Sequence, residues 1–346
     1  MTHDGLSYEK AGVDIDTADA AKRRMAASLE TSDPRVLNRL GAFASLFDAR
    51  LPGLKDPVLV LKMEEPGSKQ LLALRHGAVE SLCRDLINHL VNDVIVMGAT
   101  PLAILDTIVC GKLEKEVVTR LVDGMARAAR EQGANLVGGE TSEQPGVLAA
   151  GTYILSAAAV GVVERAKILD GSRISKGDAV LAIASNGLHT NGYTLVRMLL
   201  ELRPALAEER IGGESFLAAI LKPHVCYYQG LKDLFSSSGL HGLAHITGGG
   251  VQGNLNRILP AGTATRIDRG AIRILPVFRK IRDEGKVPDA DMLRAFNMGV
   301  GMTAVVAPEA VESIRERLGK AGHEAYPIGT IVAGDRTVEF HGSLAW

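Results

Sequence analysis

Four glycine-rich junctions, each at the end of an apolar run typical of a strand, constrain this chain's fold most strongly. They are GGET at 138–141, SNGLHTNGY at 185–193, TGGG at 247–250 and NMGVGM at 297–302. Backbone N–H groups at such a junction can face an anion, because glycine permits close approach and a helix end carries partial positive charge. One such turn is ordinary, but four favour a phosphate-bearing ligand. None matches the P-loop or the full dinucleotide-binding fingerprint, so neither class is supported.

Strand and helix patterns alternate through both halves of the chain. Apolar runs predict strands at 57–61, 104–109, 179–185 and 326–332, and helical periodicity predicts helices at 80–97, 114–132, 193–202 and 309–318. Over 346 residues, this alternation predicts an α/β (α+β) fold with two domains of similar size. The charged, turn-rich stretch 162–178 places the boundary after Lys167, giving domains 1–167 and 168–346. Residues 1–30 are polar and are expected to form an arm.

Composition restricts the partners and the compartment. The 39 Lys and Arg residues balance 40 Asp and Glu residues, so we expect no nucleic-acid partner. The uncharged stretch 144–163 is interrupted by Pro145 and glycines, so we expect no membrane span, and the N-terminus lacks a signal-peptide pattern. Three cysteines without paired spacing favour a reducing, cytoplasmic location.

The predicted helix at 80–97 carries a narrow polar wedge opposite its apolar face. The wedge contains Asp85, His89 and Asn92, with Asp93 beside them. Carboxylates on one helix face are suitable ligands for Mg²⁺ bridging nucleotide phosphates. A solvated helix face is the commoner explanation, and the pattern alone favours it.

Three further positions could carry chemistry. Glu140 follows two glycines at a strand end, where a carboxylate can contact a metal. His189 lies between glycines with Asn191 close by; a ligand role and a structural turn histidine are about equally supported. Lys69 ends the turn-forming EEPGSK and could bind phosphate, although a solvated loop lysine is commoner.

A set of motifs then makes the chain resemble the phosphoribosylformylglycinamidine cyclo-ligase (AIR synthetase) family. They are SYEKAGVDID (7–16), VNDVIVMGATPLAILD (91–106), GKL (111–113), LVGGETSEQPG (136–146), SNGLHTNGYTLVR (185–197), AHITGGGVQGNL (244–255) and AFNMGVGM (295–302). They occur in the family's order and near its spacing, and cover nearly the whole chain.

The resemblance implies a fold and a reaction. An N-terminal domain pairs its sheet with that of a second subunit in a dimeric barrel, and a C-terminal α/β domain packs beside it, so a homodimer is expected. ATP, with Mg²⁺, activates the formyl amide oxygen of formylglycinamidine ribonucleotide. Ring closure then gives aminoimidazole ribonucleotide, ADP and phosphate, in purine biosynthesis. Phosphorylation converts the amide oxygen, a poor leaving group, into a good one. The enzyme positions the phosphates and neutralises their charge.

The resemblance also implies site residues. Those matching the ATP–Mg²⁺ site are Asp85, Asp93 and Glu140, with Asn92 beside them, and the arm residues Tyr8, Lys10 and Asp14 match a segment that folds over nucleotide. His189 and Asn191, together with Thr247, Gly248, Gly249 and Gly250, match the region that receives the ribonucleotide. Catalytic roles are expected for His189, Asn191 and Lys69.

The chain departs from the family at 63–69. Where members carry a TDGVGTK-like segment, this chain has MEEPGSK, so Glu64 falls at the position of the family's metal-binding Asp. Either Glu64 or Glu65 could replace that Asp. The expected metal ligands are therefore Glu64, Asp85 and Glu140.

Two alternatives remain open from the sequence. A superfamily relative, selenophosphate synthetase or thiamine-phosphate kinase, would keep the fold and change the substrate. The former usually has a reactive residue near its N-terminus, and none of the cysteines lies in the arm. The second alternative, a catalytically impaired paralogue that binds nucleotide or a partner, rests only on the 63–69 departure.

Overall fold

The first half of the chain forms a four-stranded sheet. The computed structural model describes residues 20, 24–26, 29–37 and 44–346, so most of the predicted arm, including Tyr8, Lys10 and Asp14, lies outside the described residues. The strands are β1 (Pro57–Glu64), β2 (Thr100–Cys110), β3 (Asn135–Glu143) and β4 (Tyr153–Glu164), in the order β1-β4-β2-β3. β2 and β3 are parallel, and β4 runs antiparallel to both β1 and β2.

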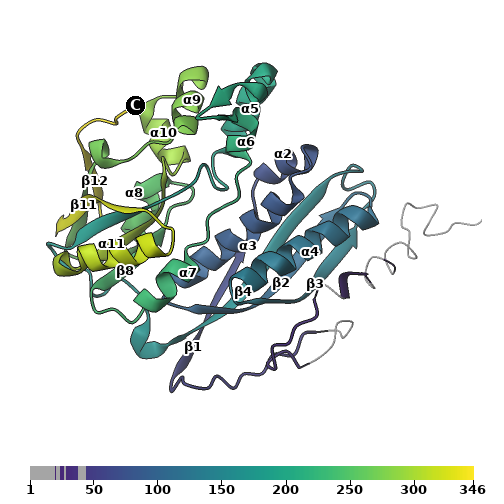
Figure 1. Cartoon of the computed structure of the whole chain (residues 1–346), viewed down its shortest axis with the longest axis horizontal. Helices are drawn as coiled ribbons and strands as arrows, with labels where there is room; N and C mark the ends of the chain where they lie inside the picture. The colour runs from purple at the N-terminus through teal and green to yellow at the C-terminus, as the bar shows by residue number, and fades with distance from the viewer. Residues whose placement is uncertain (1–19, 21–23, 27–28, 38–43) are drawn as a thin grey trace, which may run out of the picture.

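Helices cover one face of this sheet and leave much of the other uncovered. After α2 (Lys69–Arg75), the helices α3 (Val79–Ile95) and α4 (Lys115–Glu131) lie across the sheet, and α4 makes the crossover between the parallel strands (Figure 1). On β1, every second residue faces the other way. There Leu59, Leu61 and Met63 are 58%, 71% and 64% exposed.

The second half forms a six-stranded sheet of order β12-β9-β11-β5-β10-β8. Its strands are β5 (Ala179–Ala184), β8 (Leu240–His245), β9 (Thr263–Asp268), β10 (Val300–Val306), β11 (Ala325–Ala333) and β12 (Val338–His341). The pairings are antiparallel except that of β9 with β12. A separate small hairpin joins β6 (Arg210–Ile211) and β7 (Glu214–Ser215). The predicted boundary after Lys167 falls between β4 and β5.

Helices pack on both faces of the second sheet. They are α5 (Tyr193–Leu202), α6 (Phe216–Ile220), α7 (Tyr228–Leu231), α8 (Gly250–Leu255), α9 (Pro276–Gly285), α10 (Asp289–Ala295) and α11 (Val311–Lys320). Short 3-10 turns occupy Arg165–Lys167, Pro204–Glu208, Lys232–Leu234, Asn256–Ile258, Arg269–Ala271 and Pro308–Ala310. The chain is therefore a mixed α/β fold of two domains, as predicted.

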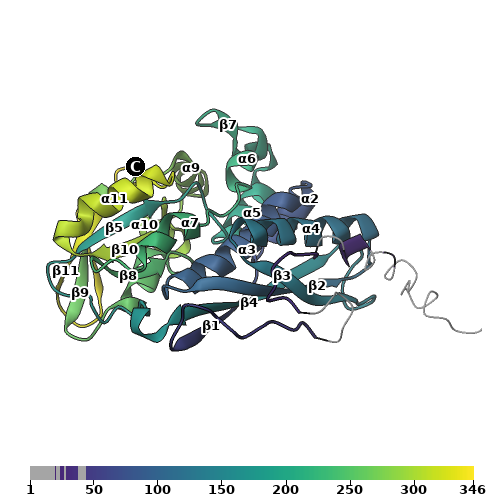
Figure 2. The ribbon, with the colours of Figure 1, turned by 60° about the horizontal axis from the view of Figure 1, so that its bottom comes forward.

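The two halves share one apolar core through α3. Leu86 and Leu90 of α3 belong to the same buried cluster as Leu181 of β5 and Met302 of β10. Figures 1 and 2 both place α3 at the junction of the two halves. The contact between the two halves is therefore part of the protein's buried core.

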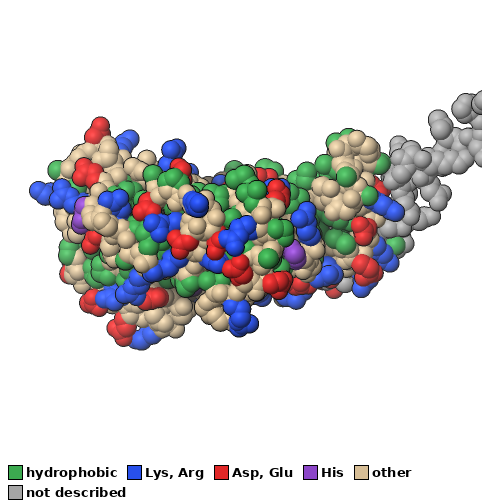
Figure 3. All heavy atoms as spheres, turned by 90° about the horizontal axis from the view of Figure 1, so that it is seen from above, with side chains coloured by type: hydrophobic (Ala, Val, Ile, Leu, Met, Phe, Trp, Pro, Cys, Tyr) green, Lys and Arg blue, Asp and Glu red, His purple; other side chains and the backbone are tan. Residues whose placement is uncertain are grey.

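The surface shows no dominant charge on the face drawn in Figure 3, where acidic and basic side chains are intermingled. Within the described part of the chain, no helix has both the length and the apolar character needed to cross a membrane.

Candidate active site at the domain junction

The polar face of α3 meets residues 222–227 of the second half, a segment with no regular secondary structure. Asp85, Asn88 and Asn92 lie on that face, about one turn apart, and are 0%, 7% and 0% exposed. Their side chains bond the backbone of the segment: His224 N–H donates to Asp85 Oδ1 (2.8 Å), Asn88 Nδ2 donates to the His224 carbonyl (2.7 Å), Asn92 Nδ2 donates to the Val225 carbonyl (2.8 Å), and Tyr227 N–H donates to Asn92 Oδ1 (3.0 Å). These side chains satisfy a buried backbone that has no strand partner.

The prediction that the polar face of this helix is exposed to solvent is therefore wrong. Asp85, His89 and Asn92 are buried, and the side chain of Asp93 is 19% exposed. A periodic pattern identifies the polar side of a helix but cannot tell whether water or another backbone faces it. Asn88, which no motif in the sequence marks, belongs to the same contact.

Lys69 and Asp85 form an ion pair with no exposed side-chain surface. Lys69 Nζ donates to Asp85 Oδ1 (2.7 Å) and to the carbonyls of His189 (3.0 Å) and Lys222 (2.6 Å), so all three ammonium protons have acceptors. Burial raises the pKa of Asp85 to about 6 and lowers the pKa of Lys69, while their mutual attraction opposes both shifts. In this structure Lys69 joins the two halves and is not presented to a ligand.

Four histidines gather beside this ion pair. His89 comes from α3, His189 and His224 come from loops, and His245 ends β8. The rings of His189 and His224 stack with centroids 3.9 Å apart, and the centroid of His245 lies 5.0 Å from that of His224. Burial lowers the pKa of His89 to about 4, and it lowers the pKa values of His189 and His224 well below the ordinary value. Burial therefore favours the neutral form of these three imidazoles.

The backbone around His189 is built to bring its ring inward. His189 has φ 60, a left-handed conformation uncommon for a side chain of this size. Gly301 on β10 leaves the necessary space, since a Cβ there would lie 2.8 Å from His189 Cε1 and closer still to the Tyr227 hydroxyl. His189 is 1% exposed, so the structure encloses the residue that the resemblance assigns to catalysis.

Two carboxylates meet at the edge of the histidine cluster. Lys62 Nζ lies 2.9 Å from Glu64 Oε2 and 3.0 Å from Asp93 Oδ2. His245 Nδ1 bonds Asp93 Oδ1 (2.7 Å), and His89 Nε2 lies 3.7 Å from Glu64 Oε2. Burial raises the pKa of Asp93, but the His245 hydrogen bond, the neighbouring histidines and Lys62 outweigh it and hold that pKa well below its usual range. Lys62 and Glu64 share one face of β1, so strand alternation could have indicated their pairing.

The three expected metal ligands do not converge in this structure. The carboxylate of Asp85 is paired with Lys69. Glu140 is exposed on β3, opposite Thr107 of β2. Two groups of described residues lie close enough to share an ion: His189, His224 and His245, and His89, Asp93 and His245. Neither group includes Glu64, Asp85 or Glu140.

The structure brings together the two glycine-rich loops of the second half. A Cβ at Gly248 would lie 3.3 Å from Asn191 Oδ1, so the 185–193 and 247–250 loops are in contact. Asn254 Nδ2 donates to the carbonyls of Thr247 (3.3 Å), Gly248 (3.2 Å) and Gly250 (2.8 Å), which fixes the turn. Gly249 (φ 94) is exposed, and a Cβ at Gly250 would collide with the Leu293 carbonyl.

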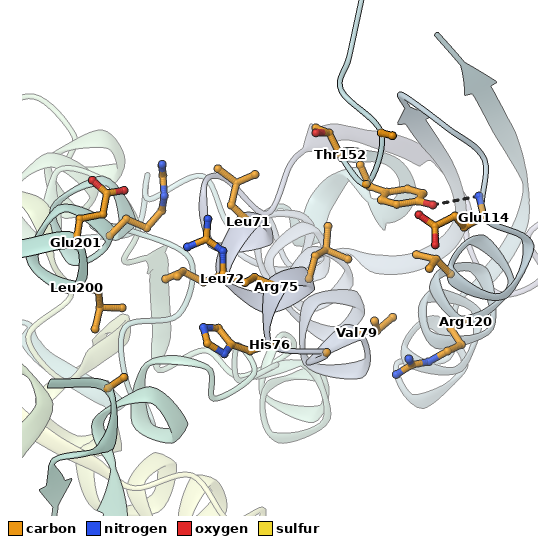
Figure 4. Close-up of a pocket in the computed structure, with 18 of the residues that line it drawn as sticks. Leu71, Leu72, Arg75, His76, Val79, Glu114, Arg120, Thr152, Leu200 and Glu201 are labelled. Atoms are coloured by element: carbon orange, nitrogen blue, oxygen red, sulfur yellow. Dashed lines mark hydrogen bonds between the residues drawn. The ribbon is translucent and has the colours of Figure 1, made fainter. Parts of the chain in front are cut away.

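A pocket of about 790 Å³ opens between α2, the start of α4 and α5 (Figure 4). Its polar lining includes Arg75, Arg120 and Arg197, with Glu114 and Glu201. In the described part of the chain, Arg120 pairs with Glu80 (3.2 Å), whereas neither Arg75 nor Arg197 forms an ion pair. Arg197 ends the motif at 185–197 and Arg120 lies in no motif, and the sequence alone does not bring the two together because they come from helices distant in the chain.

Comparison with solved structures identifies the fold. E. coli HypE, a hydrogenase maturation protein, is 18% identical with a TM-score of 0.67, covering 94% of each chain. Thiamine-monophosphate kinase from Stenotrophomonas maltophilia is 18% identical with a TM-score of 0.62, covering 96% of this chain and 98% of that chain. HypE in complex with ATP is also 18% identical, with a TM-score of 0.63, covering 98% of this chain and 92% of that chain.

Sequence comparison identifies the family. The model "AIR synthase related protein, N-terminal domain" matches residues 55–163, and the corresponding C-terminal domain model matches 175–342. Phosphoribosylformylglycinamidine cyclo-ligase of Sorangium cellulosum is 42% identical over 335 residues, covering 95% of this chain and 96% of that protein. The enzyme of the same name from Methylobacillus flagellatus is 38% identical over 329 residues, covering 95% of each. With both domain models matched in order along one chain, the protein belongs to the AIR synthase family, in its phosphoribosylformylglycinamidine cyclo-ligase branch.

Proposed function

We propose that the protein is an ATP-dependent phosphoribosylformylglycinamidine cyclo-ligase of purine biosynthesis. The observation that carries this proposal is the 42% and 38% identity, over 95% of the chain, to two curated enzymes of that name. ATP phosphorylates the formyl oxygen of formylglycinamidine ribonucleotide. The amidine-side nitrogen then attacks the formyl carbon, phosphate leaves with the former formyl oxygen, and aminoimidazole ribonucleotide forms. The three cysteines are free, which is compatible with the cytoplasmic location expected for such an enzyme.

Nucleotide binding is supported by the ATP complex of HypE, which shares this fold. Glu64 and Asp93 fit a divalent cation, because their carboxylates already flank one positive group, Lys62 Nζ, at 2.9 and 3.0 Å. They offer the oxygen ligands that Mg²⁺ prefers. When bound, Mg²⁺ would neutralise charge on the phosphates. We assign Glu64 and Asp93 to hold it, with Lys62 turning toward solvent or toward a phosphate.

The pocket lined by Arg75 and Arg197 suits the ribonucleotide substrate. Both guanidinium groups lack an ion-pair partner among the described residues, so their charge is available to a phosphate. His189 and Asn191 belong to the loop that leads into α5, which carries Arg197. Because His189 is enclosed, we assign it to positioning this loop, and Asn191, partly exposed beside Gly248, to contact substrate.

A homodimer formed through the first sheet is the second part of the proposal. Leu59, Leu61 and Met63 of β1 point away from α3 and α4, as do Leu105 (45% exposed) and Ile154 (41%) on neighbouring strands. An apolar sheet face of this kind is suited to burial against a second copy, which would close a barrel. Leu61→Glu should give a monomer by light scattering, whereas Leu202→Glu, at an exposed leucine (75%) on α5, should leave the dimer intact.

The direct test is turnover by the untagged enzyme. The protein is incubated with formylglycinamidine ribonucleotide, ATP and Mg²⁺, and the diazotisable amine of the product is measured with ADP release. Stoichiometric, ATP-dependent product supports the proposal. ATP binding without product would support the impaired-paralogue alternative. ADP release only with another phosphoryl acceptor, such as thiamine monophosphate, would move the protein to a different branch of the superfamily.

A further inference from the structure

We propose that His189, His224 and His245 form a binding site for one divalent transition-metal ion, separate from the Mg²⁺ that accompanies ATP. One ring nitrogen from each residue lies within 4.8 Å of the others. The three residues are 1%, 1% and 5% exposed, so the site is sealed inside the protein. Nothing in the proposed ring closure uses such an ion.

Asp93 fixes the ligand atom of His245. Its Oδ1 accepts a hydrogen bond from His245 Nδ1 (2.7 Å), which makes Nε2 the ring nitrogen that can offer a lone pair to an ion. A carboxylate bonded to the outer nitrogen of a ligand histidine is a common support in metal sites, because it orients the ring and raises its basicity. Here that carboxylate comes from α3, whereas the histidine ends β8.

In the absence of an ion, His245 Nε2 accepts a hydrogen bond from His224 Nε2, and an ion would take the place of that proton. Their Nε2 atoms are 2.9 Å apart, which is short for two ligands of one ion. A tetrahedral zinc site with bonds of about 2.0–2.1 Å separates its ligand atoms by roughly 3.3 Å. To admit an ion, the two nitrogens move apart by a few tenths of an ångström and the rings tilt so that both lone pairs point at it.

Three buried ring nitrogens of the cluster have no hydrogen-bond partner in the described part of the chain. Both ring nitrogens of His189 and Nδ1 of His224 are buried and lack a hydrogen-bond partner among the described residues. An unpartnered buried polar atom is costly, and a cluster of them calls for an occupant. The His189 ring stacks face to face on His224, with centroids 3.9 Å apart, so it has to turn about its side-chain bonds before one of its unpartnered nitrogens points at the ion.

The donor set selects the class of metal. Three neutral imidazoles suit Zn²⁺, Co²⁺, Ni²⁺ or Cu²⁺, whereas Mg²⁺ and Ca²⁺ require oxygen ligands. Burial lowers the pKa values of His189 and His224 and so favours the neutral rings that ligation requires. The charge of nearby Lys69 is compensated by Asp85, and Asp93 supplies negative charge behind His245.

The test uses untagged full-length protein that has been treated with a chelator and dialysed. Zn²⁺ and Co²⁺ are titrated into the wild type, His224→Gln, His245→Gln and the control His341→Gln, whose histidine is exposed on β12. We expect one ion per chain in the wild type and in His341→Gln, and at least 30-fold weaker binding in the two cluster variants. Circular dichroism and melting curves show whether each variant is folded.

The wild type alone provides a second measurement that does not depend on a variant's folding. Cobalt bound by three imidazoles should give intense visible ligand-field bands and paramagnetically shifted imidazole N–H signals, and Zn²⁺ should raise the melting temperature. Absence of stoichiometric binding, or a weak six-coordinate cobalt spectrum, would overturn the proposal. So would equal affinity in wild type and in folded His224→Gln and His245→Gln. Turnover by metal-free enzyme tests the cyclo-ligase activity separately.

Discussion

Lys69 Nζ lies 2.7 Å from Asp85 Oδ1 in an environment where neither side chain exposes any surface. The two residues are 16 positions apart in the chain, on α2 and α3, and together they anchor the carbonyl of Lys222 and the N–H of His224 from the other half. The pair therefore stabilises the contact between the two halves.

Removing one member of this pair should lower the free energy of unfolding more than removing both. Lys69→Met leaves the Asp85 carboxylate buried and uncompensated, and it should lower the free energy of unfolding by about 3–5 kcal/mol. The double variant Lys69→Met/Asp85→Asn should recover part of that loss, because Asn keeps an oxygen for the His224 N–H. Urea unfolding of both single variants and the double variant completes the cycle. Additive losses would show that the two charges do not interact.

Glu64 and Glu65 should differ in their effect on the Mg²⁺ requirement. Glu64 faces Asp93 across Lys62, whereas Glu65 is exposed and follows β1. Glu64→Gln should raise the Mg²⁺ concentration for half-maximal activity at least tenfold, and Glu65→Gln should leave it within about twofold. The measurement is a Mg²⁺ titration of turnover at saturating ATP. Equal behaviour of the two variants would remove Glu64 from the metal site.

Asp106 should make stability depend on pH. Burial raises the pKa of this β2 carboxyl to about 7, and Gly139 leaves the space that it occupies. The folded state therefore holds a proton that the unfolded state releases near pH 4, so this contribution to stability is greatest below pH 4 and declines up to pH 7. Relative to wild type, Asp106→Asn should gain about 1 kcal/mol or more of unfolding free energy per pH unit between pH 5 and 7.

The control for this pH effect is Asp335→Asn, at an exposed carboxyl after β11. Urea unfolding at pH 5, 6, 7 and 8 should show a constant difference between this variant and wild type. A pH-independent difference for Asp106→Asn as well would mean that Asp106 is ionised in the folded protein.

Arg197 should contribute to binding the ribonucleotide more than to binding ATP. Its guanidinium lines the pocket between α2 and α5 without an ion-pair partner among the described residues. Arg197→Met should raise KM for the ribonucleotide about tenfold, or about 1.4 kcal/mol, with little change in KM for ATP. Arg317→Met, at an arginine on α11 outside the pocket, is the matched control. An equal rise in both KM values would place Arg197 on the nucleotide.

The fold could be predicted well because its signals are local. The helix at 193–202 coincides with α5, and the patterns at 80–97 and 114–132 differ from α3 and α4 by one or two residues at each end. The buried strand β5 is the continuous apolar run AVLAIA, whereas the apolar pattern of β11 is interrupted by Gly329 and Thr330. Such patterns depend on neighbours within a few positions.

The site could be predicted only in part, because its contacts join distant positions. The sequence marked Asp85 and Asn92 as a polar wedge, but their partners lie in 222–227, more than 130 residues along the chain. It marked His189 by its glycine neighbours, yet nothing local shows that His224 stacks against it. Lys69 looked like a loop lysine, although the second half buries it completely.

The enclosure of α3 has a consequence for how the chain is made. Its apolar face can pack on the first sheet as soon as β4 is complete, but its polar face, with Asp85 and Asn88, waits for residues near 224. At about 5–20 residues per second, a ribosome needs roughly 3–12 seconds to go from Glu164, the end of β4, to His224. During that interval Lys69 and Asp85 are hydrated and the first half lacks its final partner. The newly made N-terminal half is thus an intermediate that the C-terminal half completes.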